Sequence, residues 1–291
     1  PPKFNTIDFL VKTKKTEAGE DSIQNIFIDG TDTSRVEQFN QYKTLILHVG
    51  FDENKHGFLN PCEDIINDNY PKYNEKSSYK AMPFIPYDPV PPYPIYTTNI
   101  MLPESSDSLL TEDKKQSFQD NMVVEFRWED KLDRGWQWVP IRVRYDKTSE
   151  YQRKGRITCN AYPTAEGVWR SINKPITERM ISTGLDIPTV ANDDIYYDRS
   201  NINARNITKG LRDFHNRYVK RKLIKEVSKR GDTLIDMSVG MGGDLQKWIE
   251  AKLSFVFGLD YSKDNIYNRI KGACARYVRM KKKIKPYQGV Y

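Results

Sequence analysis

At 291 residues the chain is long enough for two domains with hydrophobic cores of their own. Residues 200–291 contain 21 Lys and Arg against 8 Asp and Glu, a net +13, whereas residues 1–199 contain 25 against 31, a net −6. This charge asymmetry favours a polyanionic partner. We expect nucleic acid rather than a membrane, because no long apolar segment or signal peptide is present. A basic face that is merely solvated is the alternative. Three scattered cysteines and three scattered histidines exclude a disulfide framework and a Cys-x-x-Cys zinc site. We therefore expect no zinc and a reducing, intracellular compartment.

The first 175 residues predict a β-rich domain. Residues 42–49 are strand-like, residues 123–128 alternate apolar and charged side chains, and residues 136–145 predict a further strand pair. Several such strands around one core favour a small barrel. Residues 52–120 are polar and rich in proline, which indicates a long insertion or covering loop rather than a strand layer.

A short charged cluster ends this predicted domain. Arg142, Arg144 and Asp146 share one face if the segment is extended, and Lys147 follows, with Asn160 downstream. The cations would meet triphosphate oxygens while the carboxylate orients them. A solvent-facing row of salt bridges is the alternative.

A basic helix is predicted from about Asn206 to Arg230, with an apolar stripe for docking and Gly231 as its end. Nine cations cover the rest of this helix: Lys209, Arg212, Arg217, Lys220, Arg221, Lys222, Lys225, Lys229 and Arg230. A last helix is predicted to carry Ile266, Ile270, Cys274, Tyr277 and Met280.

Residues 233–260 predict a strand, a glycine turn, a helix from near Asp244, and a second strand ending at Asp260, 24 positions after Asp236. The spacing fits dinucleotides and S-adenosylmethionine equally. The glycine order differs from G-x-G-x-x-G, and Asp244 would repel a phosphate at the helix N-terminus, which favours S-adenosylmethionine. A purely structural strand-turn-helix is the alternative.

The chain is expected to be a segment of a longer polypeptide. About 60 residues after Gly231 supply two strands, where a doubly wound domain needs five or more, and the chain starts at Pro1 without methionine.

Together these residues resemble the mRNA capping enzymes of large DNA viruses, which join a guanylyltransferase to a guanine-N7 methyltransferase. Residues 1–10 look like the segment after the Lys-Trp-Lys of the fifth guanylyltransferase motif. Residues 123–128, 144–147 and 160–169 look like the sixth motif and its surroundings on the oligonucleotide-binding (OB) barrel, and residues 214–224 resemble the helix before the methyltransferase cofactor strand. The guanylyltransferase lysine is missing, because no Lys-x-Asp-Gly occurs and residues 27–30 lack a lysine.

The resemblance implies an α+β chain with an OB-fold domain over residues 1–175, a linker over 176–205, and the first part of a Rossmann-like methyltransferase domain over 206–291. It implies that Arg144, Asp146 and Lys147 close over GTP phosphates, with Mg²⁺ as the family's metal. The remaining implied site residues fall into two groups: S-adenosylmethionine contacts Lys220, Asp236, Ser238, Gly240 and Asp260, and cap contacts Asn216 and Lys247. Met241 stands where the family often has a lysine near the cap, and Ser238 where it has glycine.

The implied reaction transfers a methyl group from a sulfonium to N7 of the terminal guanine of mRNA, in host cytoplasm or virion. Since the attacking nitrogen is already nucleophilic, alignment and electrostatics suffice and we assign no catalytic side chain. A non-catalytic RNA-binding module and an inactive pseudo-methyltransferase are the alternatives. A bare RNA binder has no use for paired acids at cofactor spacing.

Overall fold

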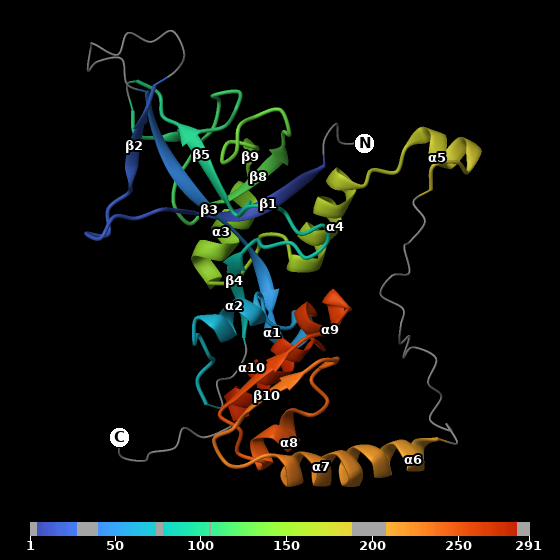
Figure 1. The fold of residues 1–291 in the computed structure, drawn as a ribbon. Helices are drawn as coiled ribbons and strands as arrows, with labels where there is room; N and C mark the ends of the chain where they lie inside the picture. Colours follow the sequence, from blue (N-terminus) through green and yellow to red (C-terminus); the bar gives the residue numbers. More distant parts are fainter. Residues whose placement is uncertain (1–4, 28–39, 74–77, 105, 188–207, 284–291) are drawn as a thin grey trace. The chain divides into compact units, whose positions relative to one another are not determined.

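The computed structural model describes residues 5–27, 40–73, 78–104, 106–187 and 208–283, and the chain divides into two compact units (Figure 1). The N-terminal unit comprises residues 1–52 and 78–187, and the C-terminal unit comprises residues 53–77 and 188–291. Residues 28–30, residues 188–205 of the predicted linker and the predicted helix start at Asn206 lie outside the described residues. Among the described helices, none combines the length and apolar character needed to cross a membrane.

The N-terminal unit is built on an antiparallel sheet of seven strands (Figure 1). Its central path runs β2-β3-β1-β8-β9, and β4 and β5 also pair with β3. The strands are β1 (Thr6–Thr13), β2 (Ile23–Ile26), β3 (Asn40–Asp52), β4 (Tyr79–Pro83), β5 (Thr97–Met101), β8 (Val123–Trp128) and β9 (Trp138–Val143). The strands predicted over residues 42–49 and 123–128 are therefore confirmed.

Aromatic residues from several strands meet in the core of this unit. The ring of Phe9 on β1 lies 5.0 Å from Trp138, 5.6 Å from Phe84 and 5.9 Å from Phe126, measured between centroids. All four side chains are almost completely buried. Burying these large rings stabilises the sheet, and Phe9 meets Phe126 and Trp138 edge to face.

The pairings among described residues leave this sheet open, so the predicted closed barrel is not confirmed. The edges of β5 and β9 do approach: Thr98 Oγ1 donates to the carbonyl of Trp138 at 3.0 Å, and Asn99 N–H to Gly135 at 2.6 Å. Further along, Pro140 lies on the free edge of β9 and has no N–H to offer a closing strand. Its carbonyl accepts instead from the Glu112 N–H, in the connection between the paired strands β6 (Leu109–Leu110) and β7 (Ser117–Phe118).

Residues 52–120 contribute strands to the main sheet, so the covering-loop interpretation was wrong for part of this range. At 13 residues, β3 is long enough to pair with β4 and β5 at different positions along one edge. The prolines flank β5 rather than interrupt it, which is why a proline-rich stretch still holds a strand.

The described helices of the N-terminal unit are α3 (Tyr145–Lys154), α4 (Tyr162–Asn173) and α5 (Glu178–Thr183). Helix α4 fixes the proline-rich segment before β5. The buried carboxylate of Glu166 accepts hydrogen bonds from the Tyr87 and Asp88 N–H groups, and Trp169 Nε1 donates to the Pro89 carbonyl at 2.8 Å. These bonds satisfy a buried acid and hold the loop against the helix.

The C-terminal unit contains one parallel β-α-β crossover among its described residues. The strands β10 (Thr233–Asp236) and β11 (Phe255–Gly258) pair in parallel with Asp236 opposite Gly258, and α8 (Leu245–Glu250) connects them. Before β10, α6 (Lys209–Phe214) continues through a π-helical turn (His215–Val219) into α7 (Lys220–Val227). This helix ends at Val227, because Ser228 is extended, and not at Gly231 as predicted.

The predicted last helix is divided into α9 (Lys263–Tyr267) and α10 (Ala273–Lys283). The side chain of Asn268 accepts hydrogen bonds from the N–H groups of Ile270 and Lys271, which stabilises a turn in place of a helix. The apolar residues keep their helical spacing across this turn, so the sequence predicted one continuous helix.

Residues 53–77 pack within the C-terminal unit although they interrupt the sequence of the other unit. This segment carries α1 (Glu53–His56) and α2 (Pro61–Ile66). Phe58 is buried with Ala275 and Val278 of α10, and Glu53 pairs with Lys282 at 2.6 Å. The C-terminal unit is therefore assembled from two stretches of sequence more than a hundred residues apart.

We expect Phe58→Ala to destabilise the C-terminal unit by about 3 kcal/mol, because the mutation leaves a cavity beside α10. Amide hydrogen exchange should show loss of protection in α10. Tyr73→Ala is the matched control, since this ring lies in the same segment and is 43% exposed. Equal α10 protection in Phe58→Ala and the unmutated protein would contradict the assembly.

Candidate functional sites

The glycine turn between β10 and α8 is shaped by two residues with positive φ, Gly240 at 54° and Gly242 at 69°. A side chain at Gly242 would also meet Leu245 Cδ1 at 2.9 Å, so glycine is required there for both reasons. Asp244 is the residue before α8, so the predicted helix start is confirmed. The turn brings several backbone N–H groups to the carboxyl end of the two parallel strands.

The two predicted acids lie at that same end of the strands. Asp236 is the last residue of β10, and its carboxylate accepts the Ser238 N–H at 2.9 Å. Asp260 follows β11 and accepts the Gly240 N–H at 2.7 Å. The structure thus brings Asp236, Ser238, Gly240 and Asp260 together around one turn.

The carboxylate of Asp260 is held in its charged form. Burial works against ionisation, but hydrogen bonds from Asn265 Nδ2, Ser262 N–H and Gly240 N–H together keep the pKa of Asp260 below its ordinary value. An ionised carboxylate at this position is an acceptor for hydroxyl groups.

Two predicted lysines converge on Asp244. Lys220 at the start of α7 lies 3.1 Å from its carboxylate, and Lys247 on α8 contacts the other oxygen while being only 8% exposed. Burial opposes ionisation of Asp244, yet the hydrogen bonds from Lys247 and Lys220 lower its pKa. Lys220 therefore lies beside the glycine turn, and the single carboxylate of Asp244 holds two cations.

Asn216 lies in the π-helical turn, one helical turn before Lys220. Turns of this kind are rare and occur frequently at functional sites. The stacked rings of Phe214 and Tyr218, with centroids 5.4 Å apart, flank Asn216 in sequence and are more than half exposed.

The second candidate site lies in the N-terminal unit, where Arg144, Asp146 and Lys147 meet an acid that sequence reasoning missed. Strand β9 ends at Val143 and α3 starts at Tyr145, so the extended geometry predicted for Arg142–Asp146 was wrong. Arg142 instead pairs with Glu125 at 2.6 Å. Arg144 Nη1 and Lys147 Nζ each lie 2.6 Å from Asp8 Oδ2 on β1. The sequence signal was an acid between two apolar residues, Ile7 and Phe9, which marks Asp8 but not its partners.

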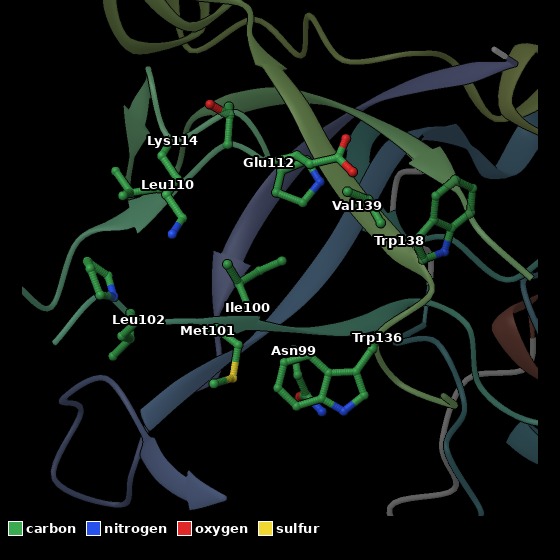
Figure 2. A pocket seen from close by; sticks show the side chains of 13 residues that line it. Asn99, Ile100, Met101, Leu102, Leu110, Glu112, Lys114, Trp136, Trp138 and Val139 are labelled. Atoms are coloured by element: carbon green, nitrogen blue, oxygen red, sulfur yellow. The ribbon is translucent and has the colours of Figure 1, made fainter. Parts of the chain in front are cut away.

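A cavity of about 280 Å³ lies along the seam between β5 and β9 (Figure 2). Asn99, Ile100 and Met101 of β5 line one side, and Trp136 and Val139 line another. The volume is at the lower edge of small-molecule sites, about 300–1,000 Å³. The lining of this cavity contains none of the site residues predicted from sequence.

Within the part of the chain that the structure describes, no group of three or more His, Cys, Asp or Glu side chains is placed to hold a metal ion.

The chain is thus a mixed α/β protein with an antiparallel unit and a β-α-β unit carrying a glycine turn with paired acids. No protein-family model matches it. It is similar to a protein named "Probable mRNA-capping enzyme" from Acanthamoeba polyphaga mimivirus, with 30% identity over 311 aligned positions that cover 100% of this chain and 23% of the relative. The chain therefore spans under a quarter of that relative's length. The similarity supports the resemblance to viral capping enzymes.

Proposed function

We propose that this chain is a segment of a viral mRNA capping enzyme whose C-terminal unit begins an S-adenosylmethionine-dependent guanine-N7 methyltransferase. The observation that carries the proposal is the glycine turn bonded to Asp260 through Gly240 N–H, with Asp236 at the end of the neighbouring parallel strand. In Rossmann-like folds a ligand binds outside the carboxyl ends of the strands, where these groups lie. Asp260 would bind the ribose hydroxyls of the donor.

The surroundings of Asp244 favour a donor without phosphates over a dinucleotide. This carboxylate precedes α8, where a dinucleotide would place its pyrophosphate. It is paired with both Lys220 and Lys247, so neither ammonium group is free of a partner to meet a pyrophosphate. Lys220, 46% exposed at its side chain, is placed to exchange Asp244 for the carboxylate of the methionine moiety.

The exposed face of the β10–β11 pair supports a larger domain of this type. Ile235, Met237, Phe255 and Phe257 are each more than half exposed on it. Parallel strands are normally covered on both faces, so this face requires further packing elements. We propose that a complete methyltransferase domain covers it.

Methyl transfer itself would depend on alignment of guanine N7, the methyl group and the leaving sulfur, with no general base. S-adenosylmethionine supplies the electrophilic methyl group. Asp236, Ser238, Gly240 and Asp260 would hold and orient the donor, and Asn216 and Lys247 would contact the cap.

For the N-terminal unit we propose the OB domain of the GTP–RNA guanylyltransferase. Strands β5, β3, β1, β8 and β9 follow one another around the sheet, and the outer two approach at Thr98 and Trp138. A partly open, five-stranded antiparallel barrel is the OB architecture. Arg144, Asp146 and Lys147 would contact the GTP phosphates, and Mg²⁺ would accompany GTP.

A polypeptide that contains the complete methyltransferase domain tests the proposal. It should transfer a labelled methyl group from S-adenosylmethionine to RNA ending in an unmethylated guanine cap, and nuclease digestion should release 7-methylguanosine. RNA binding without donor binding would instead support the non-catalytic RNA-binding module.

The basic helix α6–α7 yields a prediction about mRNA binding. Arg212, Arg217 and Lys225 form no ion pair with another described residue, whereas Arg221 pairs with Glu250 at 3.0 Å. Replacing Arg212, Arg217 and Lys225 with Ala should make the log–log salt dependence of RNA affinity shallower by about 2, at roughly 0.7 per single-strand phosphate contact.

Fluorescence anisotropy with labelled single-stranded RNA, measured at several salt concentrations, checks this slope. Alanine preserves the helix, so loss of fold does not confuse the result. The matched control replaces three cations of the N-terminal unit, Arg153, Lys154 and Arg156. An unchanged slope in the α6–α7 variant would identify these residues as a solvated basic face.

A further inference from the structure

Asp8 is an almost fully buried carboxylate that no motif singled out. Its side chain is 7% exposed, and its Oδ2 atom lies 2.6 Å from both Arg144 Nη1 and Lys147 Nζ. A buried charge is tolerated when cations neutralise it and donate hydrogen bonds to it. One acid on β1 therefore fixes two cations at the start of α3.

The backbone around Asp8 leaves its carboxylate little freedom to move. Asp8 N–H donates to Asn160 Oδ1 at 2.7 Å, and Asn160 N–H donates back to the Asp8 carbonyl at 2.9 Å. Both sequence neighbours, Ile7 and Phe9, are completely buried. Movement of Asp8 would break the strand pairing and leave a charge without partners.

Asp146 contacts the opposite edge of the Arg144 guanidinium, and it is exposed to solvent where Asp8 is buried. Its side chain is 69% exposed, and its two oxygens lie 3.3 Å from Arg144 Nη2 and 3.4 Å from Arg144 Nε. Exposed ion pairs contribute little stability, so an incoming anion can replace this one. Arg144 thus has a permanent carboxylate on one edge and an exchangeable carboxylate on the other.

We propose that Asp8 is a positioning residue that holds Arg144 and Lys147 for a triphosphate, while the triphosphate displaces Asp146 from the outer edge of Arg144. This rests on the proposed function of Arg144 and Lys147 as phosphate contacts, and it makes Asp146, grouped with them above, the carboxylate that the phosphates replace. The two carboxylates on one arginine then have opposite effects: Asp8 favours anion binding and Asp146 competes with it.

Calorimetric titration of the full chain with inorganic tripolyphosphate tests the proposal. Asp8→Asn should lower the affinity about tenfold, because two cations lose their orientation. Asp146→Asn should raise it about threefold, because a weak competitor is removed. Asp88→Asn is the matched control, since Asp88 also holds one arginine and one lysine in this unit, Arg170 at 3.4 Å and Lys174 at 3.1 Å.

The opposite signs separate positioning from simple charge repulsion, which predicts tighter anion binding for both variants. Tighter binding by Asp8→Asn would overturn the positioning role while leaving the phosphate site intact. Equal affinity of the unmutated chain and Arg144→Ala would instead overturn the phosphate site itself, and the inference with it.

A second measurement decides the question if Asp8→Asn does not fold. Carboxyl ¹³C NMR of the unmutated chain should show the Asp146 signal moving on addition of tripolyphosphate while the Asp8 signal stays in place. Movement of the Asp8 signal alone would overturn the proposal.

Discussion

Asp260→Ala should weaken S-adenosylmethionine binding by about 1–3 kcal/mol in a polypeptide that contains a complete methyltransferase domain, the range for leaving buried hydrogen-bonding groups unmatched. The structure gives two reasons for the loss. The donor would lose an ionised acceptor for its ribose, and Gly240 N–H would lose the partner that now lies 2.7 Å away. Calorimetry with S-adenosylhomocysteine measures the effect without turnover.

The matched control changes the surroundings of Asp260 and keeps both contributions. Asn265→Ala removes a different hydrogen bond to Asp260, of 2.9 Å, and leaves the acid and its bond to Gly240 in place. We expect this variant to lose less affinity than Asp260→Ala. Unchanged affinity in Asp260→Ala would remove this acid from the donor site and reduce the glycine turn to a structural strand-turn-helix.

The donor site was predictable because its determinants are local in sequence. Two short apolar runs, glycines between them and an acid after each strand specify strand, turn and helix within 28 residues, and the structure brings Asp236, Gly240 and Asp260 together. The pairing of Asp244 with Lys220 was not predictable. It depends on how α7 packs beside α8, which the sequence pattern of either helix leaves open.

The phosphate cluster was predicted only in part, for two physical reasons. Tyr145 and Asp146 continue the alternating apolar and charged pattern of β9, yet the chain turns into α3 at Tyr145. The sequence pattern therefore predicted an extended segment where the structure has a helix. Asp8 is 136 positions from Arg144, and only the antiparallel pairing of β1 with β8 and of β8 with β9 brings the two together. Contacts of such sequence separation have no local signature.

Packing between distant segments also explains what was missed in the fold. Residues 53–77 contain too few apolar residues to indicate a core, yet Phe58 and Ile65 complete one with Ala275 and Val278. The closed barrel expected from strand count alone is absent from the pairings of the described residues, because Pro140 removes a donor from the edge that would close it.

Lys147→Ala should slow formation of the covalent enzyme–GMP adduct about a hundredfold in a polypeptide that also carries the guanylyltransferase lysine, the scale for losing one transition-state charge contact. The side chain is 25% exposed and points one ammonium group at Asp8, so it can donate to a phosphate while remaining paired. Radiolabelled GTP reports the adduct. Lys154→Ala, on the same helix with a 68% exposed side chain, is the matched control and should keep the unmutated rate.

The fold should survive Lys147→Ala, because Arg144 still neutralises Asp8 at 2.6 Å and Ala favours a helix. Circular dichroism and thermal unfolding confirm this before rates are compared. A slow adduct in a folded variant assigns Lys147 to the transferring phosphates rather than to stability. A rate equal to that of Lys154→Ala would show that Lys147 serves only to balance the charge of Asp8, and Arg144 would then be the only cation of this cluster left to contact GTP.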